Sequence, residues 1–204
     1  MSQSTFTRLV LCIGLLPSVA GCFGSTPPKE RYHYYLNLPA ATTVESQGPR
    51  LAVGDITAAP GYDSERIAFR IEDNELRYYG YRLWVTTPPK LIEEAVLRHL
   101  EASKRFSQVD LDERMKDPQA VLTVHIDALE EIDEKERTKA RLALSFTLRG
   151  VETDRVLLRH SFDEQRVCAQ RHPGVVARAV SAILAQQMNL LVQRLTKRLS
   201  HLSK

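Results

Sequence analysis

Polar and apolar residues alternate with period two along two stretches in the second half of the chain, at 122–128 and 142–148, and a third stretch rich in apolar residues follows at 156–162. Successive side chains of a β-strand point to opposite faces, so each alternating stretch predicts a strand with one buried and one solvated face. Alternation of this kind is typical of antiparallel sheets, and 150–154 supplies a turn between the last two stretches. We therefore expect an antiparallel meander of three strands.

Two other stretches repeat every three to four residues, as an α-helix requires. The first begins at Pro88 and Pro89, which suit the first turn of a helix, and continues for about four turns to Ser103. The second runs from Val175 to about Leu199 and ends in basic residues, which are favourable at a helix C-terminus. Its apolar stripe consists of Val176, Val180, Ile183, Leu184, Met188, Leu191, Leu195 and Leu199.

Earlier apolar segments at 32–38, 51–56, 67–71 and 75–84 are bounded by turn-forming residues and predict further strands. The charged run 130–136 lacks the glycine and the alternating ligands of a calcium loop, so we expect a solvated hairpin there. Together these elements predict an α+β fold. We expect a mostly antiparallel sheet with two main amphipathic helices packed on it, in a single domain over residues 31–200.

The N-terminal segment 1–21 has the layout of a secretory signal peptide, with Arg8 before a short apolar stretch and small residues before the cleavage site. An apolar region of roughly 7–15 residues is too short for a stable transmembrane helix. The run Val19-Ala20-Gly21-Cys22 resembles the bacterial lipoprotein box, in which the cysteine is acylated and becomes the first mature residue. Ordinary cleavage that leaves Cys22 unmodified and a cytoplasmic protein with an apolar start remain as alternatives.

Residues 22–30 then form a lipidated N-terminus and a proline-containing linker. Removal of 21 of the 204 residues leaves 183, enough for one domain with its own core. The chain has 28 Lys and Arg residues against 25 Asp and Glu, a near balance that does not indicate a nucleic-acid partner. Of the three cysteines only Cys168 would remain unmodified in the mature chain, so no internal disulfide is expected and this thiol should be a buried small apolar group.

Several of these motifs occur together in one order. A Tyr- and Leu-rich strand at 32–38 is followed by Leu51-Ala52-Val53-Gly54, by Tyr62-Asp63, and by Arg70 ahead of Asn74-Glu75-Leu76. Arg82 and Trp84 then precede the proline-led helix. This arrangement resembles the ABC-type transport auxiliary lipoprotein family, which includes the lipoprotein of the paraquat-inducible (Pqi) system. The likeness covers roughly residues 32–195.

The resemblance implies a non-catalytic auxiliary component of a transport system that moves lipids or other hydrophobic compounds across the cell envelope. Its implied partners are a periplasmic mammalian-cell-entry (MCE) domain protein and, indirectly, an ABC permease and ATPase. Members can form rings, so a homo-oligomer is expected. Phe23 follows Cys22, whereas an Asp there often retains a lipoprotein in the inner membrane. We therefore expect a palmitate-bearing lipoprotein on the periplasmic face of the outer membrane.

The resemblance also points to a partner or oligomer interface. Its candidate residues are Tyr62, Arg70, Asn74, Glu75, Tyr81, Arg82 and Trp84. Tyr, Trp and Arg are enriched in interface hot spots. The alternative is that the aromatic rings simply pack between sheet and helix.

The residue pattern contains little that indicates catalysis, and we expect neither an enzyme nor a cofactor. The six histidines show neither the i, i+4 pairing of a zinc helix nor a nearby cysteine pair, so no metal site is expected. The sharpest catalytic candidates are Thr123, His125 and Asp127 on one strand face, with Ser145 and Arg141 beside them. Residues two apart on a strand lie about 7 Å apart, so a solvated face or a partner surface is the favoured interpretation.

Two other functions remain open. A structural lipoprotein that assists outer-membrane assembly of lipopolysaccharide or of a secretion pore would share the anchor and the α+β form. A periplasmic hydrolase that uses His125 or Asp127 is the other.

Overall fold

The computed structural model of the chain describes residues 29–39, 48–72, 74–134 and 136–200. The expected signal peptide 1–21, Cys22 and most of the linker 22–30 lie outside these residues. In chain order the elements are β1 (Tyr32–Tyr34), β2 (Arg50–Ala58), β3 (Arg66–Glu72), β4 (Glu75–Trp84), α1 (Pro88–Ala102), β5 (Gln108–Leu111), β6 (Ala120–Glu134), β7 (Arg137–Gly150), β8 (Val156–Cys168) and α2 (Pro173–Leu199).

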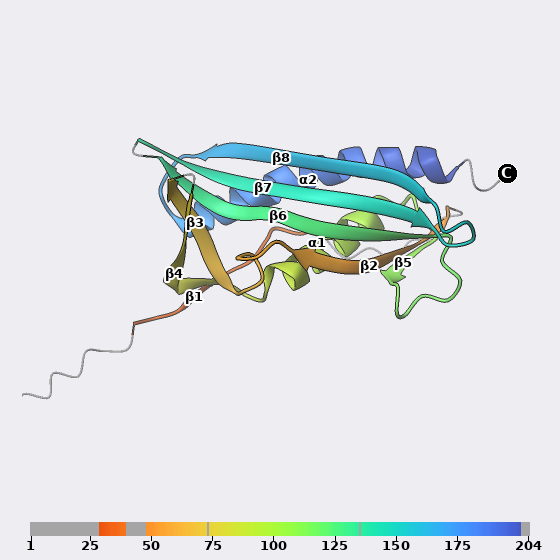
Figure 1. Cartoon of the computed structure of the whole chain (residues 1–204), viewed down its shortest axis with the longest axis horizontal. Helices are drawn as coiled ribbons and strands as arrows, with labels where there is room; N and C mark the ends of the chain where they lie inside the picture. Colours follow the sequence, from red (N-terminus) through yellow and green to blue (C-terminus); the bar gives the residue numbers. More distant parts are fainter. Residues whose placement is uncertain (1–28, 40–47, 73, 135, 201–204) are drawn as a thin grey trace, which may run out of the picture.

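The sheet is built around β6, which has neighbours along both edges. On one edge β7 pairs with its whole length, and β8 continues the sheet beyond β7, so the three long strands lie side by side in Figure 1. On the other edge β2 pairs with the first half of β6, and β3 pairs with residues 130–132. The loop 59–65 therefore joins two strands that share one edge of β6. β4 and β1 follow β3, and β5 lies beyond β2.

The expected mostly antiparallel sheet is wrong, because the sheet is mixed. Among the described strands, the pairs β1 with β4, β2 with β5, β2 with β6 and β3 with β6 are parallel. Only the β3–β4 hairpin and the β6–β7–β8 meander are antiparallel. The period-two pattern reports burial of one face and carries no information on strand direction. The parallel pairs join strands far apart in the sequence, which no local pattern identifies.

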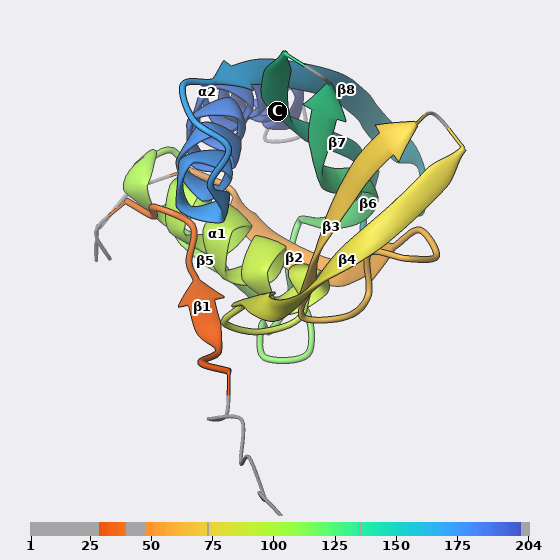
Figure 2. The same cartoon turned by 90° about the vertical axis from the view of Figure 1, so that its left-hand side faces the viewer.

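The two helices cover one face of the sheet, which curves around them in Figure 2. Both begin with a proline at the first helical positions, where a missing N–H costs nothing. His172 caps α2, because its side chain accepts a hydrogen bond from the Gly174 N–H at 3.0 Å. Every residue of the predicted apolar stripe of α2 is buried. The prediction of two amphipathic helices on one α+β sheet is confirmed.

The helix α2 is also long and apolar enough, by length and composition alone, to cross a membrane. Its most apolar window has a mean hydropathy of 1.4, and 61% of that window is buried inside the fold. Burial of this extent is what a core helix of a folded domain requires, because its apolar face must be covered by the sheet.

Two local expectations are only partly right. The first predicted strand, 32–38, is shorter than expected, because β1 ends at Tyr34. The charged run 130–136 does contain the turn of the β6–β7 hairpin, but its first residues are not solvated, since β6 continues to Glu134. Glu130 and Glu131 are almost completely buried in the sheet.

Candidate functional site

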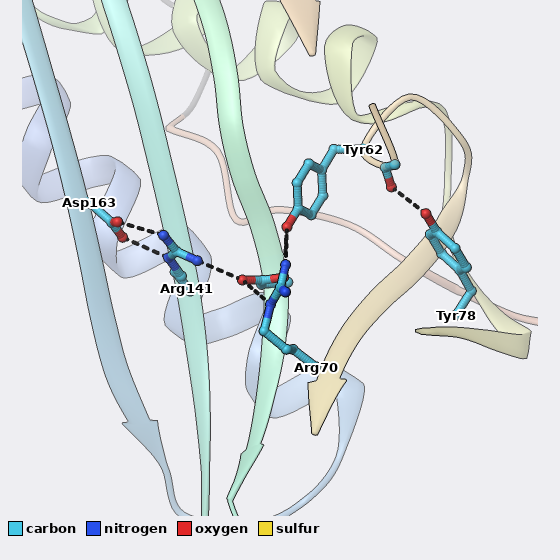
Figure 3. Close-up of polar contacts among 7 residues, drawn as sticks. Tyr62, Arg70, Tyr78, Arg141 and Asp163 are labelled. Carbon is cyan, nitrogen blue, oxygen red and sulfur yellow. Dashed lines mark hydrogen bonds and ion pairs between the residues drawn. The ribbon is translucent and has the colours of Figure 1, made fainter. Parts of the chain in front are cut away.

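The buried Glu130 lies at the centre of a polar network on the sheet face that does not carry the helices. Its side chain is 0% exposed. The carboxylate accepts hydrogen bonds from the Tyr62 hydroxyl at 2.7 Å, from Nη1 of Arg141 at 2.9 Å and from Nε of Arg70 at 3.2 Å (Figure 3). A buried carboxylate is tolerated only when such donors replace its lost hydration. The network therefore joins the loop after β2 to β3, β6 and β7.

A β-bulge in β6 explains why an acidic pair is buried here. Ile126 pairs with Leu144, but Ala128 pairs with Ala143, so Asp127 is an extra residue in β6. A one-residue insertion moves all later side chains to the opposite face. After the bulge Leu129 and Glu131 face the helices, and Glu130 lies on the outer face opposite Arg141.

Arg141 extends the network across the sheet to β8. Its guanidinium donates two hydrogen bonds to the Asp163 carboxylate, at 2.8 and 2.7 Å. Such bidentate pairs are strong and geometrically specific. Arg141 lowers the pKa of Asp163 below its ordinary value, and Asp163 together with Glu130 raises the pKa of Arg141 in spite of its burial. The two guanidiniums of Arg70 and Arg141 balance the charges of the two carboxylates.

Tyr62 attaches the loop after β2 to this network. Burial and the hydrogen bond to Glu130 raise the pKa of Tyr62 to about 12, so the phenol stays protonated and donates. The preceding Gly61 has φ +99°, and a Cβ there would lie 2.8 Å from Leu76 and 2.9 Å from the Tyr78 hydroxyl. That hydroxyl also donates to the Gly61 carbonyl at 3.1 Å (Figure 3). Glycine is therefore needed for β4 to approach this loop closely.

Glu131 makes an equivalent connection on the helix-covered face. Its carboxylate accepts a hydrogen bond from the Tyr79 hydroxyl of β4 at 3.0 Å. Burial and Glu131 raise the pKa of Tyr79 to about 12, and burial raises the pKa of Glu131. The Tyr79 ring packs against Phe69, with the two ring centroids 4.8 Å apart. The Arg82 guanidinium lies 5.8 Å from the centroid of the Tyr79 ring. Adjacent glutamates thus hold the β3–β4 hairpin from both faces of the sheet.

The chemistry of these side chains suits holding the β3–β4 hairpin in place and does not suit catalysis. Each carboxylate is occupied by hydrogen-bond donors, and both tyrosines are held in their protonated form. We call Tyr62, Arg70, Tyr79, Glu130, Glu131, Arg141 and Asp163 the glutamate clamp. The clamp fixes the β3–β4 hairpin on the long strands β6, β7 and β8.

The structure brings together some of the predicted interface residues and separates others. Tyr62 and Arg70 belong to the clamp, with the hydroxyl of Tyr62 3.3 Å from Nη2 of Arg70. Trp84 is 1% exposed and packs in the core. Arg82 is half-buried beside Tyr79, whereas Tyr81 is 45% exposed. The two remaining candidates, Asn74 and Glu75, are exposed at the hairpin turn.

Sequence reasoning missed the two glutamates and Asp163 as site residues. One signal was present: the apolar positions Leu122, Val124 and Ile126 are followed by adjacent apolar residues at 128 and 129, which marks a change of phase. A bulge at that point would have placed Glu130 and Glu131 on opposite faces of a continuing strand.

The alternative catalytic residues lie on the outer face, before the bulge. Nδ1 of His125 is hydrogen-bonded to the Thr57 hydroxyl at 2.8 Å, and Asp127 accepts from the Ser145 hydroxyl at 2.7 Å. Nε2 of His125 lies 3.9 Å from Asp127, beyond hydrogen-bond distance, and both side chains are partly exposed. Arg141 is not beside them but in the clamp. These side chains form separate hydrogen-bonded pairs on a partly solvated face, and they do not form a catalytic triad.

The remaining titratable groups add little chemistry. Within the described residues no group of three or more His, Cys, Asp and Glu side chains could hold a metal ion. Cys168 is a buried free thiol, as predicted, and burial raises its pKa. A thiol in that state is a poor nucleophile, because the reactive form is the thiolate.

A cavity of about 510 Å³ lies between β2, the start of α1 and the segment after β5. Its rim carries Asp55, Glu93, Asp112 and Glu113 as well as Lys90. Pockets that enclose apolar ligands are lined predominantly by apolar and aromatic side chains. The acidic rim of this cavity does not have that character.

Comparison with known proteins identifies the family. A model of the ABC-type transport auxiliary lipoprotein component family matches residues 34–192. No curated protein matches the chain. The fold is similar to the crystal structure of a Xanthomonas campestris protein of the family DUF330, with a TM-score of 0.71 and 21% identity over 86% of this chain and 99% of that one. An uncharacterized protein has a TM-score of 0.68 and 10% identity over 82% of this chain and 99% of its own.

These two likenesses show a shared fold, and the family match covers every residue of the clamp, the whole of α1 and most of α2. The chain belongs to the family of ABC-type transport auxiliary lipoprotein components.

Proposed function

We propose that this protein is a lipid-anchored, non-catalytic component of an MCE/ABC-type transport system that moves lipids or other hydrophobic compounds across the cell envelope. Family membership supports the lipoprotein character and the association with a transporter. The observation that carries the proposal is the glutamate clamp, because it holds an exposed hairpin at a fixed place on a long sheet. A rigid, exposed hairpin suits a component that binds a partner.

The anchor is proposed at Cys22, with the domain on the periplasmic face of the outer membrane. Acyl chains contribute about 0.8 kcal/mol per buried methylene, so two or more chains retain a domain stably on a bilayer. Labelling with radioactive palmitate should mark the full chain and should leave the Cys22→Ala variant unlabelled. An unlabelled wild-type chain in the soluble periplasmic fraction would contradict the anchor.

The partner surface is proposed on the β3–β4 hairpin. Asn74, Glu75 and Tyr81 are exposed there, and Glu75 is held by Arg77 through bonds of 2.7 and 3.0 Å. The less exposed candidates Tyr62, Arg70, Arg82 and Trp84 would hold the backbone of the hairpin in place through the clamp and the core. The proposed partner is a periplasmic MCE-domain protein, which in turn contacts a permease and an ATPase.

Co-purification tests this assignment. The tagged full-length chain, extracted from its own membranes in mild detergent, should retain an MCE-domain protein and ABC components. An Asn74→Ala/Glu75→Ala double variant should lose them, whereas Val151→Ser, an exposed substitution in the β7–β8 turn, should keep them. Recovery of a β-barrel assembly protein in place of MCE and ABC components would instead support the structural lipoprotein considered above.

We also propose that copies of the chain associate. Among the described strands β8 pairs only with β7, so one edge of a 13-residue strand has no strand neighbour. Such an edge favours pairing with another chain. Light scattering on the detergent-solubilised full chain should give a mass several times that of the monomer, and a monomer at all concentrations would contradict the proposal.

A further inference from the structure

The segment that leads into the fold carries two exposed tyrosines, Tyr32 in β1 and Tyr35 directly after it. Tyr32 is 53% exposed and Tyr35 is 64% exposed, and their Cα atoms are at most about 10 Å apart because the two residues are three positions apart in the chain. Lys29 and Arg31, also exposed, lie in the same segment. The intervening Glu30 accepts a hydrogen bond from the Tyr32 hydroxyl at 2.8 Å.

This segment is fixed to the domain at several points. The Lys29 ammonium lies 5.1 Å from the Tyr81 ring centroid of β4. The Tyr34 carbonyl accepts from the Val85 N–H at 3.0 Å, and the Asn37 N–H donates to the Ser181 hydroxyl of α2 at 2.9 Å. Leu36 is buried between these contacts. Tyr32 and Tyr35 therefore remain exposed although the backbone that carries them is held in place.

The distance to the proposed anchor is short. Cys22 and Lys29 are seven positions apart in the chain, so the two are at most about 25 Å apart. Figure 1 shows that this segment enters at the β1 end of the domain, with the end of α2 on the opposite side of the molecule. If Cys22 is acylated, this end of the molecule faces the bilayer.

We propose that Tyr32 and Tyr35, flanked by Lys29 and Arg31, form a membrane-contacting surface that lies in the headgroup layer of a phospholipid bilayer. This inference rests on the proposed acylation of Cys22. Tyrosine favours the membrane interface because its ring is apolar and its hydroxyl needs water or a polar partner. Cations near the surface are attracted by anionic lipid phosphates.

With β1 at the bilayer, the turn of the β3–β4 hairpin lies away from the membrane. β1 pairs with Arg82–Trp84, the end of β4 opposite to Glu75. From Arg82 to Glu75 the strand covers roughly 23 Å at about 3.3 Å per residue. Figure 2 shows the turn end of β3 and β4 well away from β1. A bilayer bound at Tyr32 and Tyr35 would thus leave the hairpin turn accessible to a partner in the periplasm.

A spin label reports the contact directly. The acylated full chain is labelled at His33→Cys, an exposed position between the two tyrosines, in a Cys168→Ser background. It is reconstituted into vesicles of phosphatidylethanolamine and phosphatidylglycerol. The control carries the label at Val151→Cys in the distant β7–β8 turn. Collision rates are then measured with a water-soluble nickel chelate and with oxygen, which concentrates in lipid.

The proposal predicts that the label at position 33 collides with the nickel chelate several-fold less often than the label at 151. This protection should disappear in a Tyr32→Ser/Tyr35→Ser variant whose near-ultraviolet circular dichroism matches that of wild type. Equal collision rates at both positions, in a chain shown by mass spectrometry to be acylated, would overturn this inference alone. A chain without acyl groups would overturn both this inference and the proposed anchor.

Discussion

Replacement of Glu130 by Gln tests whether the glutamate clamp stabilises the fold. Glutamine has the same shape but no charge, and its amide group would face a guanidinium donor in place of a carboxylate oxygen. Removal of one partner from a buried ion pair typically costs about 3–5 kcal/mol. Two features reduce the cost here: Arg141 keeps its two bonds to Asp163, and the Arg70 side chain is 21% exposed. We therefore expect a loss of about 3 kcal/mol in the free energy of unfolding.

The assay is thermal and urea unfolding of the full chain beside a matched control. For a domain of this size about 3 kcal/mol corresponds to a decrease in Tm of about 6–12 °C. Glu134→Gln is the control, because Glu134 lies on the same strand but is exposed and contacts Lys139 at the surface. Surface pairs contribute about 0–1 kcal/mol. If Glu130→Gln and Glu134→Gln gave the same small change, the clamp would not hold the hairpin as argued.

Three further substitutions examine separate parts of the clamp. Tyr62→Phe removes one hydrogen bond to Glu130 and should lower the free energy of unfolding by about 1–2 kcal/mol in urea, and an unchanged midpoint would contradict that role. Gly61→Ala adds a Cβ at φ +99° against Leu76 and should cost about 1–3 kcal/mol, so equal thermal stability would refute the need for glycine. Glu131→Gln should remove a pH dependence. Because burial raises the folded pKa of Glu131 above its ordinary 4.5, wild type gains stability relative to the variant at low pH and loses it as pH rises through the folded pKa. A wild-type-minus-variant difference that is constant from acid to neutral pH would contradict this.

The sequence predicted those elements whose burial pattern is local. The apolar stripe of α2 and the alternation along β6 and β7 each depend on neighbouring residues, and each was found, although both strands extend beyond the predicted stretches at both ends. The pairing of β2 and β3 with β6 was missed, because parallel strands need a long connection and leave no mark on the residues between them. Strand direction therefore required the structure.

The clamp was only partly predictable for a related reason. Tyr62 and Arg70 were recognised as candidate interface residues, but the residue that gathers them, Glu130, lies 68 and 60 positions away in the chain. Acidic runs usually lie in solvent, and only the bulge at Asp127 places Glu130 and Glu131 on opposite faces of a buried strand end. The hairpin therefore owes its position to contacts that composition alone does not indicate.

The central claim is that the clamped hairpin contacts an MCE-domain protein, and site-specific photo-cross-linking tests it most directly. A photoreactive amino acid replaces Asn74 in the full chain within its native membranes, and Val151 carries the same group in the control. We expect a cross-link from position 74 to an MCE-domain protein and none from position 151. A cross-link from position 74 to an outer-membrane β-barrel protein, or equal MCE cross-linking from both positions, would contradict it.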